Sequence, residues 1–90
     1  MTLRDLTPGM ADQLQLPRGI RGVVVMGVEA GEAAEDAGLQ RGDVIVSVNG
    51  QDVEDMGSFD REIAKAKADG LARLRVRRGN QHQFLILKLG

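Results

Sequence analysis

The sequence predicts a mostly β domain of the α+β class, in which two to three helices close the openings of a small, partly open β-barrel. Three observations predict this class. Short β-branched or alternating apolar runs recur, glycine-containing turns separate them, and only one stretch has the length and spacing of a helix of several turns. Because 90 residues are enough for one modest hydrophobic core, we expect residues 1–90 to form a single domain.

The first half of the chain contains two short predicted helices with a strand between them. Thr7 offers a side-chain cap directly ahead of a proline, which predicts a helix over 8–14. A β-branched run bounded by glycines predicts a buried strand over 22–28. Residues 32–37 are helix formers with acids near the start, and Gly38 stands where helices often end, so we expect a second helix there.

The middle of the chain predicts a strand pair and the longest helix. A strand over 44–48 leads into Asn49-Gly50, a strong signal for a two-residue hairpin, and returns through 51–53. Asp55 is placed to cap a helix over 56–68. One face of that helix is apolar and carries Phe59, Ile63 and Ala66.

The C-terminal segment predicts a final hairpin. Apolar residues at 72, 74 and 76 alternate with arginines, as in a strand with one buried face, and a turn over 78–81 leads into an apolar run over 84–89. Since Phe59 and Phe84 are the only aromatic residues, we expect an aliphatic core. The methionines are expected to fill gaps in that core: Met1, Met10, Met26 and Met56.

Composition excludes several classes of function. There is no cysteine for a disulfide, a thiolate nucleophile or a zinc site, and the single His82 cannot form a multi-histidine site, so we expect no metal and no cofactor. A net charge of −1 gives no overall field that would attract nucleic acid. No apolar run approaches the roughly 18–20 residues that span a bilayer, so we expect no direct membrane insertion and a soluble chain, either cytosolic or part of an exported protein.

Two local patterns suggest chemistry that the surrounding sequence does not support. Arginines at 73, 75, 77 and 78 would suit phosphate binding, but strand alternation explains three of them and no aromatic stacking partners accompany them. We interpret them as a solvated strand face, without a nucleic-acid partner. Ser47, Ser58 and His82 do not predict a hydrolytic triad, because Ser47 lies in a predicted strand and Ser58 in the first turn of a predicted helix. The chain is expected to be non-catalytic.

Four segments together resemble the signature of PDZ domains: 22–25, 31–39, 41–45 and 48–50. The resemblance spans nearly the whole chain. A strand at the start, then Thr7-Pro8 and a short helix, and an Arg-Arg-Gly hairpin before the last strand are similar to the PDZ domains of HtrA/Deg-family serine proteases. These domains have the circularly permuted bacterial form, and the chain most resembles the second PDZ domain of such a protease.

The resemblance implies a peptide-binding groove. In this family the C-terminus of a peptide adds as a strand beside the first strand, here 1–5, and the longest helix forms the other wall. The implied groove residues are Met1, Thr2, Leu3, Arg4, Met56, Asp60 and Ile63. The glycine-containing loop that holds the peptide carboxylate would lie mostly upstream of Met1, so weakened or absent peptide binding is expected for this fragment even though the fold survives. Asp60 would favour a basic or hydroxyl-bearing side chain upstream of the terminus.

The implied function is therefore non-catalytic peptide recognition on behalf of an HtrA-like serine protease. Its ligands would be hydrophobic C-termini or extended segments of misfolded or partner proteins, presented to the protease in bacterial protein quality control, and other domains of the parent protease would be partners. The family implies the periplasm. Two alternatives remain open: a structural domain that packs between protease subunits with a vestigial groove, and a PDZ domain of a C-terminal-processing or intramembrane protease.

Overall fold

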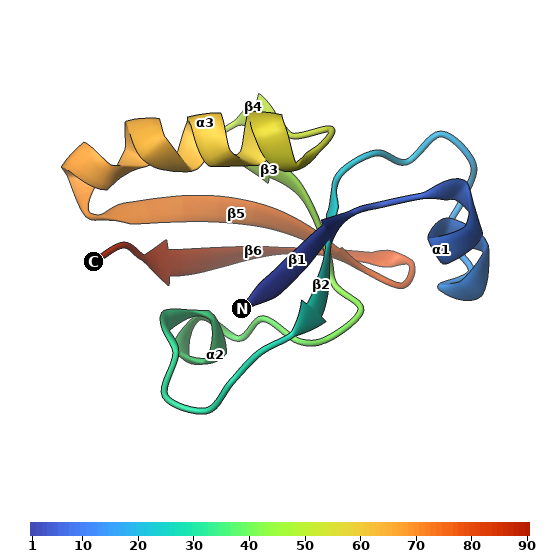
Figure 1. Ribbon diagram of the computed structural model, residues 1–90, viewed down its shortest axis with the longest axis horizontal. Helices are drawn as coiled ribbons and strands as arrows, with labels where there is room; N and C mark the ends of the chain where they lie inside the picture. Colours follow the sequence, from blue (N-terminus) through green and yellow to red (C-terminus); the bar gives the residue numbers. More distant parts are fainter.

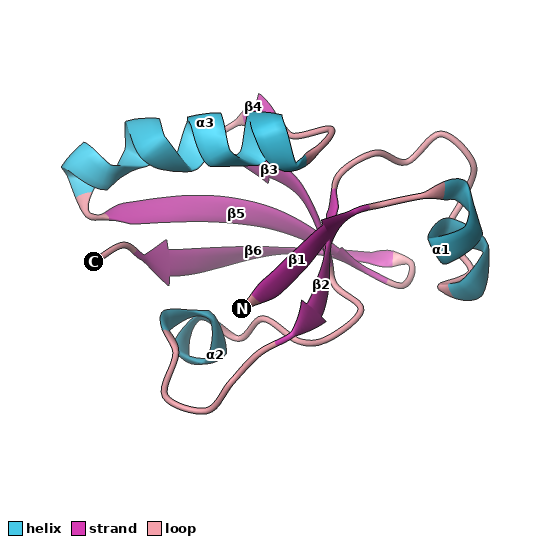
Figure 2. Ribbon diagram, viewed as in Figure 1, coloured by secondary structure: helices cyan, strands magenta, loops and turns pink.

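Six strands and three short helices follow one another in the order that the sequence predicts. The computed structural model describes residues 1–90. The strands are β1 Thr2–Asp5, β2 Val23–Gly27, β3 Val44–Val48, β4 Gln51–Asp52, β5 Leu71–Arg78 and β6 Gln81–Lys88. The α-helices are α1 Pro8–Gln13, α2 Ala33–Ala37 and α3 Met56–Ala66, and a 3-10 turn, η1 Lys67–Asp69, follows α3 (Figure 2).

All strands pair antiparallel in one curved sheet. The strand order is β1-β2-β3-β5-β6, with β4 attached to β3, so β1 and β6 lie at the two ends. In Figure 1, β1 and β2 cross the direction of the β5–β6 hairpin, α3 lies along one side of that hairpin and α2 lies at the other. This arrangement confirms the mostly β fold with helices at the openings of the sheet.

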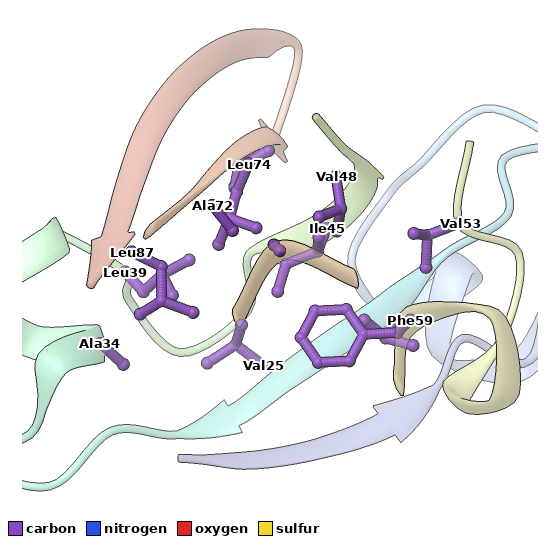
Figure 3. Close-up of a cluster of buried hydrophobic side chains, with 13 residues drawn as sticks. Val25, Ala34, Leu39, Ile45, Val48, Val53, Phe59, Ala72, Leu74 and Leu87 are labelled. Carbon is purple, nitrogen blue, oxygen red and sulfur yellow. The ribbon is translucent and has the colours of Figure 1, made fainter. Parts of the chain in front are cut away.

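The core is one cluster of 13 buried side chains drawn from five strands or strand ends and from two helices. Ala72, Leu74 and Val76 are fully buried on one face of β5, which confirms the predicted alternation. Phe59 is 5% exposed and packs among the aliphatic side chains (Figure 3). The prediction that methionines fill the core holds only at its margin: none of the four is among the 13 core residues, but Met1 and Met56 are half-buried and pack against them. Met10 and Met26 are half-buried and are not among the side chains that pack against the core.

Local chemistry explains where most elements begin and turn. The Thr7 hydroxyl accepts a hydrogen bond from the Met10 amide (3.1 Å) and caps α1 as predicted. Asn49 and Gly50 both have positive φ, 50° and 82°, which a tight hairpin with the right-handed twist of its strands requires. The longest helix begins at a capping box, in which the Asp55 carboxylate accepts from the Ser58 amide (2.8 Å).

Two boundaries differ from the sequence prediction by two or more residues. The α-helix ends at Ala66 rather than at 68, because the chain tightens into the 3-10 turn η1 before Gly70 reverses it at a φ of 75°. The strand β6 begins at Gln81 rather than at 84, since the final turn needs only two residues, Gly79 and Asn80. The hairpin is therefore longer than its apolar run.

Candidate functional site

The strand β1 has one free edge. It pairs only with β2, with Leu3 opposite Val25 and Asp5 opposite Val23, and no other strand lies beside it in the sheet. An edge strand exposes a row of backbone N–H and C=O groups that can pair with another chain in extended conformation. The strand with this free edge also contacts the long helix α3.

One hydrogen bond and one shared cavity relate the two ends of β1 to the opposite ends of α3. At one end, the Asp5 carboxylate accepts a hydrogen bond from the Met56 amide (2.7 Å), so the end of β1 meets the start of α3. At the other end, Met1 and Lys67 line the same cavity, so the start of the chain lies near the end of α3. We call the surface between β1 and α3, where the resemblance implies a peptide-binding groove, the groove.

The α3 wall of the groove is apolar at two positions and acidic at one. Met56 and Ile63 are half-buried and pack against the core, while Asp60, between them on the helix, is exposed. These three positions recur at about one-turn spacing and therefore share one side of the helix. Phe59 points into the core instead, as predicted.

The β1 wall alternates as a strand with one face toward the core. Leu3 is half-buried and packs against the core cluster, whereas Thr2 and Arg4 are exposed. The structure thus brings the sequence-predicted residues of β1 and α3 together on two neighbouring elements. Whether they contact a ligand stays a prediction.

A cavity of about 590 Å³ lies at the Met1 end of the groove. Its apolar lining comes from Met1, Ala33, Ala34, Leu87 and Leu89, and two cations, Lys67 and Lys88, also line it. Sequence analysis did not identify these lysines. Lys67 could have been predicted, because helical spacing from Asp60 and Ile63 places it on the groove side of the helix. The position of Lys88 could not, because it depends on how β6 approaches β1.

One carboxylate also lines this cavity. The Glu32 side chain contacts the Met1 amino group and accepts a hydrogen bond from the Glu29 amide (2.8 Å). Both contacts favour the charged form, so they lower the pKa of Glu32 from its ordinary value, the amino group having the larger effect. The Met1 end of the groove therefore holds charges of both signs around an apolar centre.

A second cavity, of about 700 Å³, lies beyond the other end of β1. It is lined by the loop after α1 and by the start of α3, and Asp5, Asp12 and Asp55 are among its lining residues. Two of these carboxylates are engaged, since Asp5 accepts from Met56 and Asp55 caps α3. The cavity therefore lies next to the Asp5–Met56 hydrogen bond, at the end of the groove that is opposite Met1.

The residues considered for catalysis serve structural roles or lie apart. Ser47 is buried within β3, at 6% exposure, and the Ser58 hydroxyl is part of the capping box of α3. His82 is exposed on β6, where its ring lies 3.4 Å from the Arg77 guanidinium. No group of three or more His, Cys, Asp or Glu side chains is arranged to hold a metal ion, and no helix is long and apolar enough to cross a membrane.

Known proteins share this fold and sequence pattern. The profile of the PDZ domain family matches residues 2–89. A probable periplasmic serine endoprotease DegP-like from Chlamydia muridarum is 34% identical over 96% of this chain and 17% of the relative. A protein of the same name from Brucella suis is 37% identical over 77% of this chain and 14% of the relative. The chain thus spans less than a fifth of the length of these relatives.

Two solved structures with bound peptides are similar to this chain. The HtrA3 PDZ domain bound to a phage-derived ligand, FGRWV, has a TM-score of 0.78 and 29% identity, over 98% of this chain and 79% of that one. The HtrA-type protease AlgW with a decapeptide has a TM-score of 0.83 and 30% identity, over 98% of this chain and 27% of that one. The matched residues here comprise a non-catalytic module and no protease domain. The chain belongs to the PDZ domain family, and it resembles the PDZ domains of HtrA/DegP-family serine proteases.

Proposed function

We propose that the groove binds an extended peptide by addition of a strand to β1. The observation that supports this most strongly is the free edge of β1 beside α3, because a ligand there gains backbone hydrogen bonds from the edge and side-chain contacts from the helix. The peptide-bound structures of the HtrA3 and AlgW proteins, which share this fold, support peptide binding as such.

The geometry favours one direction for the ligand. A peptide antiparallel to β1 has its C-terminus at the Met1 end, where the cavity is apolar at its centre and where Lys67 and Lys88 stand. An apolar terminal side chain would enter that cavity, and an ammonium group near it would stabilise the terminal carboxylate by a charge-assisted interaction. We infer that this chain recognises hydrophobic C-termini.

Side chains upstream of the terminus would pass Asp60. An exposed carboxylate on the groove wall attracts a cation and repels an acidic side chain, so Asp60 favours ligands with a basic or hydroxyl-bearing residue upstream. The FGRWV ligand of the HtrA3 domain has an arginine two residues before its terminus, and it is therefore a suitable first probe for this groove.

The relatives suggest the setting of this activity. Since the similar proteins are named probable periplasmic serine endoproteases, we propose that the domain serves an HtrA-like protease in the bacterial periplasm. There it would present misfolded or partner proteins to the protease, or regulate it, as one part of protein quality control. The partners would be peptide segments and the other domains of the parent protease.

Hydrogen–deuterium exchange tests strand addition directly. Binding of FGRWV should slow exchange at the amides of Thr2–Asp5 that face away from β2, because a new strand would accept their hydrogen bonds. Amides in the centre of the β5–β6 hairpin, which are already paired, serve as the internal control. Peptide binding that leaves every β1 amide exchanging at its original rate would show that the ligand does not add to this edge.

A further inference from the structure

The outer side of the β5–β6 hairpin carries a patch that the groove does not use. Leu71, Phe84 and Ile86 are 45%, 65% and 48% exposed, and they are the only large hydrophobic side chains in the structure that are exposed. All three point away from the core on one side of one hairpin. We call this surface, Leu71, Arg73, Arg75, Phe84 and Ile86, the hairpin face.

Apolar and cationic side chains lie directly opposite one another on the hairpin face. Arg73 pairs with Ile86 across the two strands, and Arg75 pairs with Phe84. The Arg73 guanidinium also lies over the Phe84 ring, 5.7 Å from its centroid, as a cation–π contact. The expectation that no aromatic residue accompanies these arginines was wrong, because the hairpin register pairs Phe84 with Arg75 and brings its ring under the Arg73 guanidinium.

The positive charge of this face is only partly balanced nearby, because Asp52 and Glu54 line a cavity together with Arg75 and Arg77 but form no ion pair with either arginine. Residues 70–90 contain no Asp or Glu, and neither Arg73 nor Arg75 takes part in any of the ion pairs of the structure. Arg77, the next outward residue of β5, donates only to the Gly79 carbonyl and contacts His82. The whole molecule carries a charge of −1, so this local excess of cations is balanced elsewhere on the chain.

We propose that the hairpin face is a second docking surface, which binds a protein partner whose contact area is apolar at its centre and carries carboxylates around it. Arginine and aromatic side chains are the residues most enriched among the dominant contacts of protein interfaces. Unpaired guanidinium groups beside them select acidic partners, because carboxylates accept two hydrogen bonds from one guanidinium.

Other anionic ligands use only part of this surface. A nucleic acid would use the arginines and stack on Phe84, but Leu71 and Ile86 offer no base-stacking surface. A lipid surface is usually entered by side chains at the tip of a loop or on one side of a helix, whereas here the apolar residues alternate with cations on a sheet. An acidic protein surface uses both the apolar and the cationic residues.

The hairpin face and the groove lie on different parts of the sheet. The groove borders β1, at one end of the strand order, and the hairpin face belongs to β5 and β6 at the other end. The two sites approach each other at Lys88, which lines the cavity at the Met1 end and pairs with Leu71, whereas Arg75 and Phe84 lie farther along the hairpin. The inward side of β5, with Ala72, Leu74 and Val76, separates the hairpin face from the core on which α3 packs. A peptide in the groove and a partner on the hairpin face can therefore be bound together.

A peptide titration monitored by amide shifts tests the proposal. The probe is an acetylated and amidated peptide of Glu-Leu-Glu-Ala repeats, whose blocked ends keep it from mimicking a free C-terminus. Two matched peptides carry Lys in place of Glu, or Ser in place of Leu. We expect shifts at 71–75 and 84–86 with the first peptide, no saturable binding of the lysine peptide, and about tenfold weaker binding of the serine peptide.

Paired variants locate the contact. The double variant R73E/R75E should weaken binding of the Glu-Leu peptide about tenfold or more, whereas R41E/R61E, which changes two exposed arginines by the same charge, should leave it unchanged. Both variants should still bind FGRWV in the groove, which separates this proposal from the previous one. Substitution F84S should weaken the Glu-Leu peptide and leave the serine peptide unchanged.

Several outcomes would overturn the proposal. Equal affinity for the leucine and serine peptides would show simple charge attraction without apolar docking. Tighter binding of a single-stranded RNA oligonucleotide, or of phosphatidylglycerol-containing vesicles, at the same residues would assign the face to a different partner. Self-association of the chain that R73E/R75E abolishes would make a second copy the occupant. Loss of FGRWV binding alone would leave the hairpin face proposal intact.

Discussion

Arg78 and Asp43 form a buried ion pair that joins the end of β5 to the turn before β3. The guanidinium donates from Nε to Oδ1 and from Nη2 to Oδ2, each at 2.8 Å, and Nη2 also donates to the Gly38 carbonyl at 3.0 Å. Asp43 is 1% exposed and its Oδ2 accepts from the Gln40 amide as well. The hydrogen bonds to the Asp43 carboxylate raise the pKa of Arg78 above its ordinary value.

Removing Arg78 should therefore destabilise the domain. The variant R78M leaves the Asp43 carboxylate buried with only its backbone donor, the Gln40 amide. We expect a loss of about 2 kcal/mol in the free energy of unfolding. This loss is below the usual range for a fully buried pair, because the Arg78 side chain is partly exposed. Urea unfolding measures this. The matched variant R75M, on the same strand without an ion pair, should change stability by less than about 0.5 kcal/mol. Equal losses in the two variants would refute a special role for Arg78.

A close approach of backbone at Gly22 gives a second prediction. A Cβ at this position would lie 2.4 Å from the Ile45 carbonyl oxygen, and the φ of 156° is unusual for other residues. Because the neighbouring atoms are backbone of a central strand, G22A should destabilise the domain by about 2 kcal/mol or more. Gly27, at the end of β2, has open space within 4 Å of where a Cβ would lie, so G27A should be near neutral. Thermal unfolding of both variants measures the difference.

Acid should weaken the start of α3. Hydrogen bonds from the Ser58 amide and hydroxyl hold the pKa of Asp55 below its ordinary value of 3.8. A carboxylate whose pKa is lower in the folded than in the unfolded state stabilises the fold fully above the unfolded pKa, and this contribution is lost as the pH falls through the folded pKa. The difference in melting temperature between the wild type and D55N should therefore shrink below about pH 4.

The control for this pH dependence is D52N. Asp52 is exposed and its carboxylate accepts no hydrogen bond, so its substitution should produce a small difference that changes little with pH. If the D55N difference were as large at pH 2 as at pH 7, the charge of Asp55 would not be what stabilises the capping box.

The lysine at the end of α3 allows a matched test of carboxylate recognition. Lys67 lines the cavity at the Met1 end, whereas Lys65 lies on another side of α3 and pairs with Glu62 at 3.2 Å. We expect K67Q to weaken binding of FGRWV severalfold and to leave its amidated form unaffected, and K65Q to change neither. Isothermal titration measures both. Equal weakening of the free and amidated peptides would show that Lys67 does not contact the carboxylate.

Much of the fold was predictable because local signals and the global arrangement agree. Thr7-Pro8, Asn49-Gly50 and Asp55 each determine a cap or a turn through their own backbone preferences, and the structure has each of them in that role. The alternation of β5 similarly identified its buried face. These features depend on residues that are near one another in the sequence.

The contacts that could not be predicted join distant segments. The Arg78–Asp43 pair spans 35 positions, and the apolar run of β6 gave no indication that Leu87 is buried while Phe84 is exposed. In the groove, periodicity placed Met56, Asp60 and Ile63 on one side of a helix, and the resemblance supplied β1 as the opposite wall. Lys88 was missed, since its place depends on where β6 ends relative to Met1.

An amide-shift titration with FGRWV, as the free acid and as the C-terminal amide, tests the central claim most directly. We expect saturable shifts at Thr2–Asp5 and Met56–Ile63 with the free acid, and much smaller shifts with the amide, because the C-terminus should lie at the Met1 end near Lys67. Equal response to both forms would contradict terminal recognition. No response at millimolar peptide from the folded chain would contradict peptide binding in this groove.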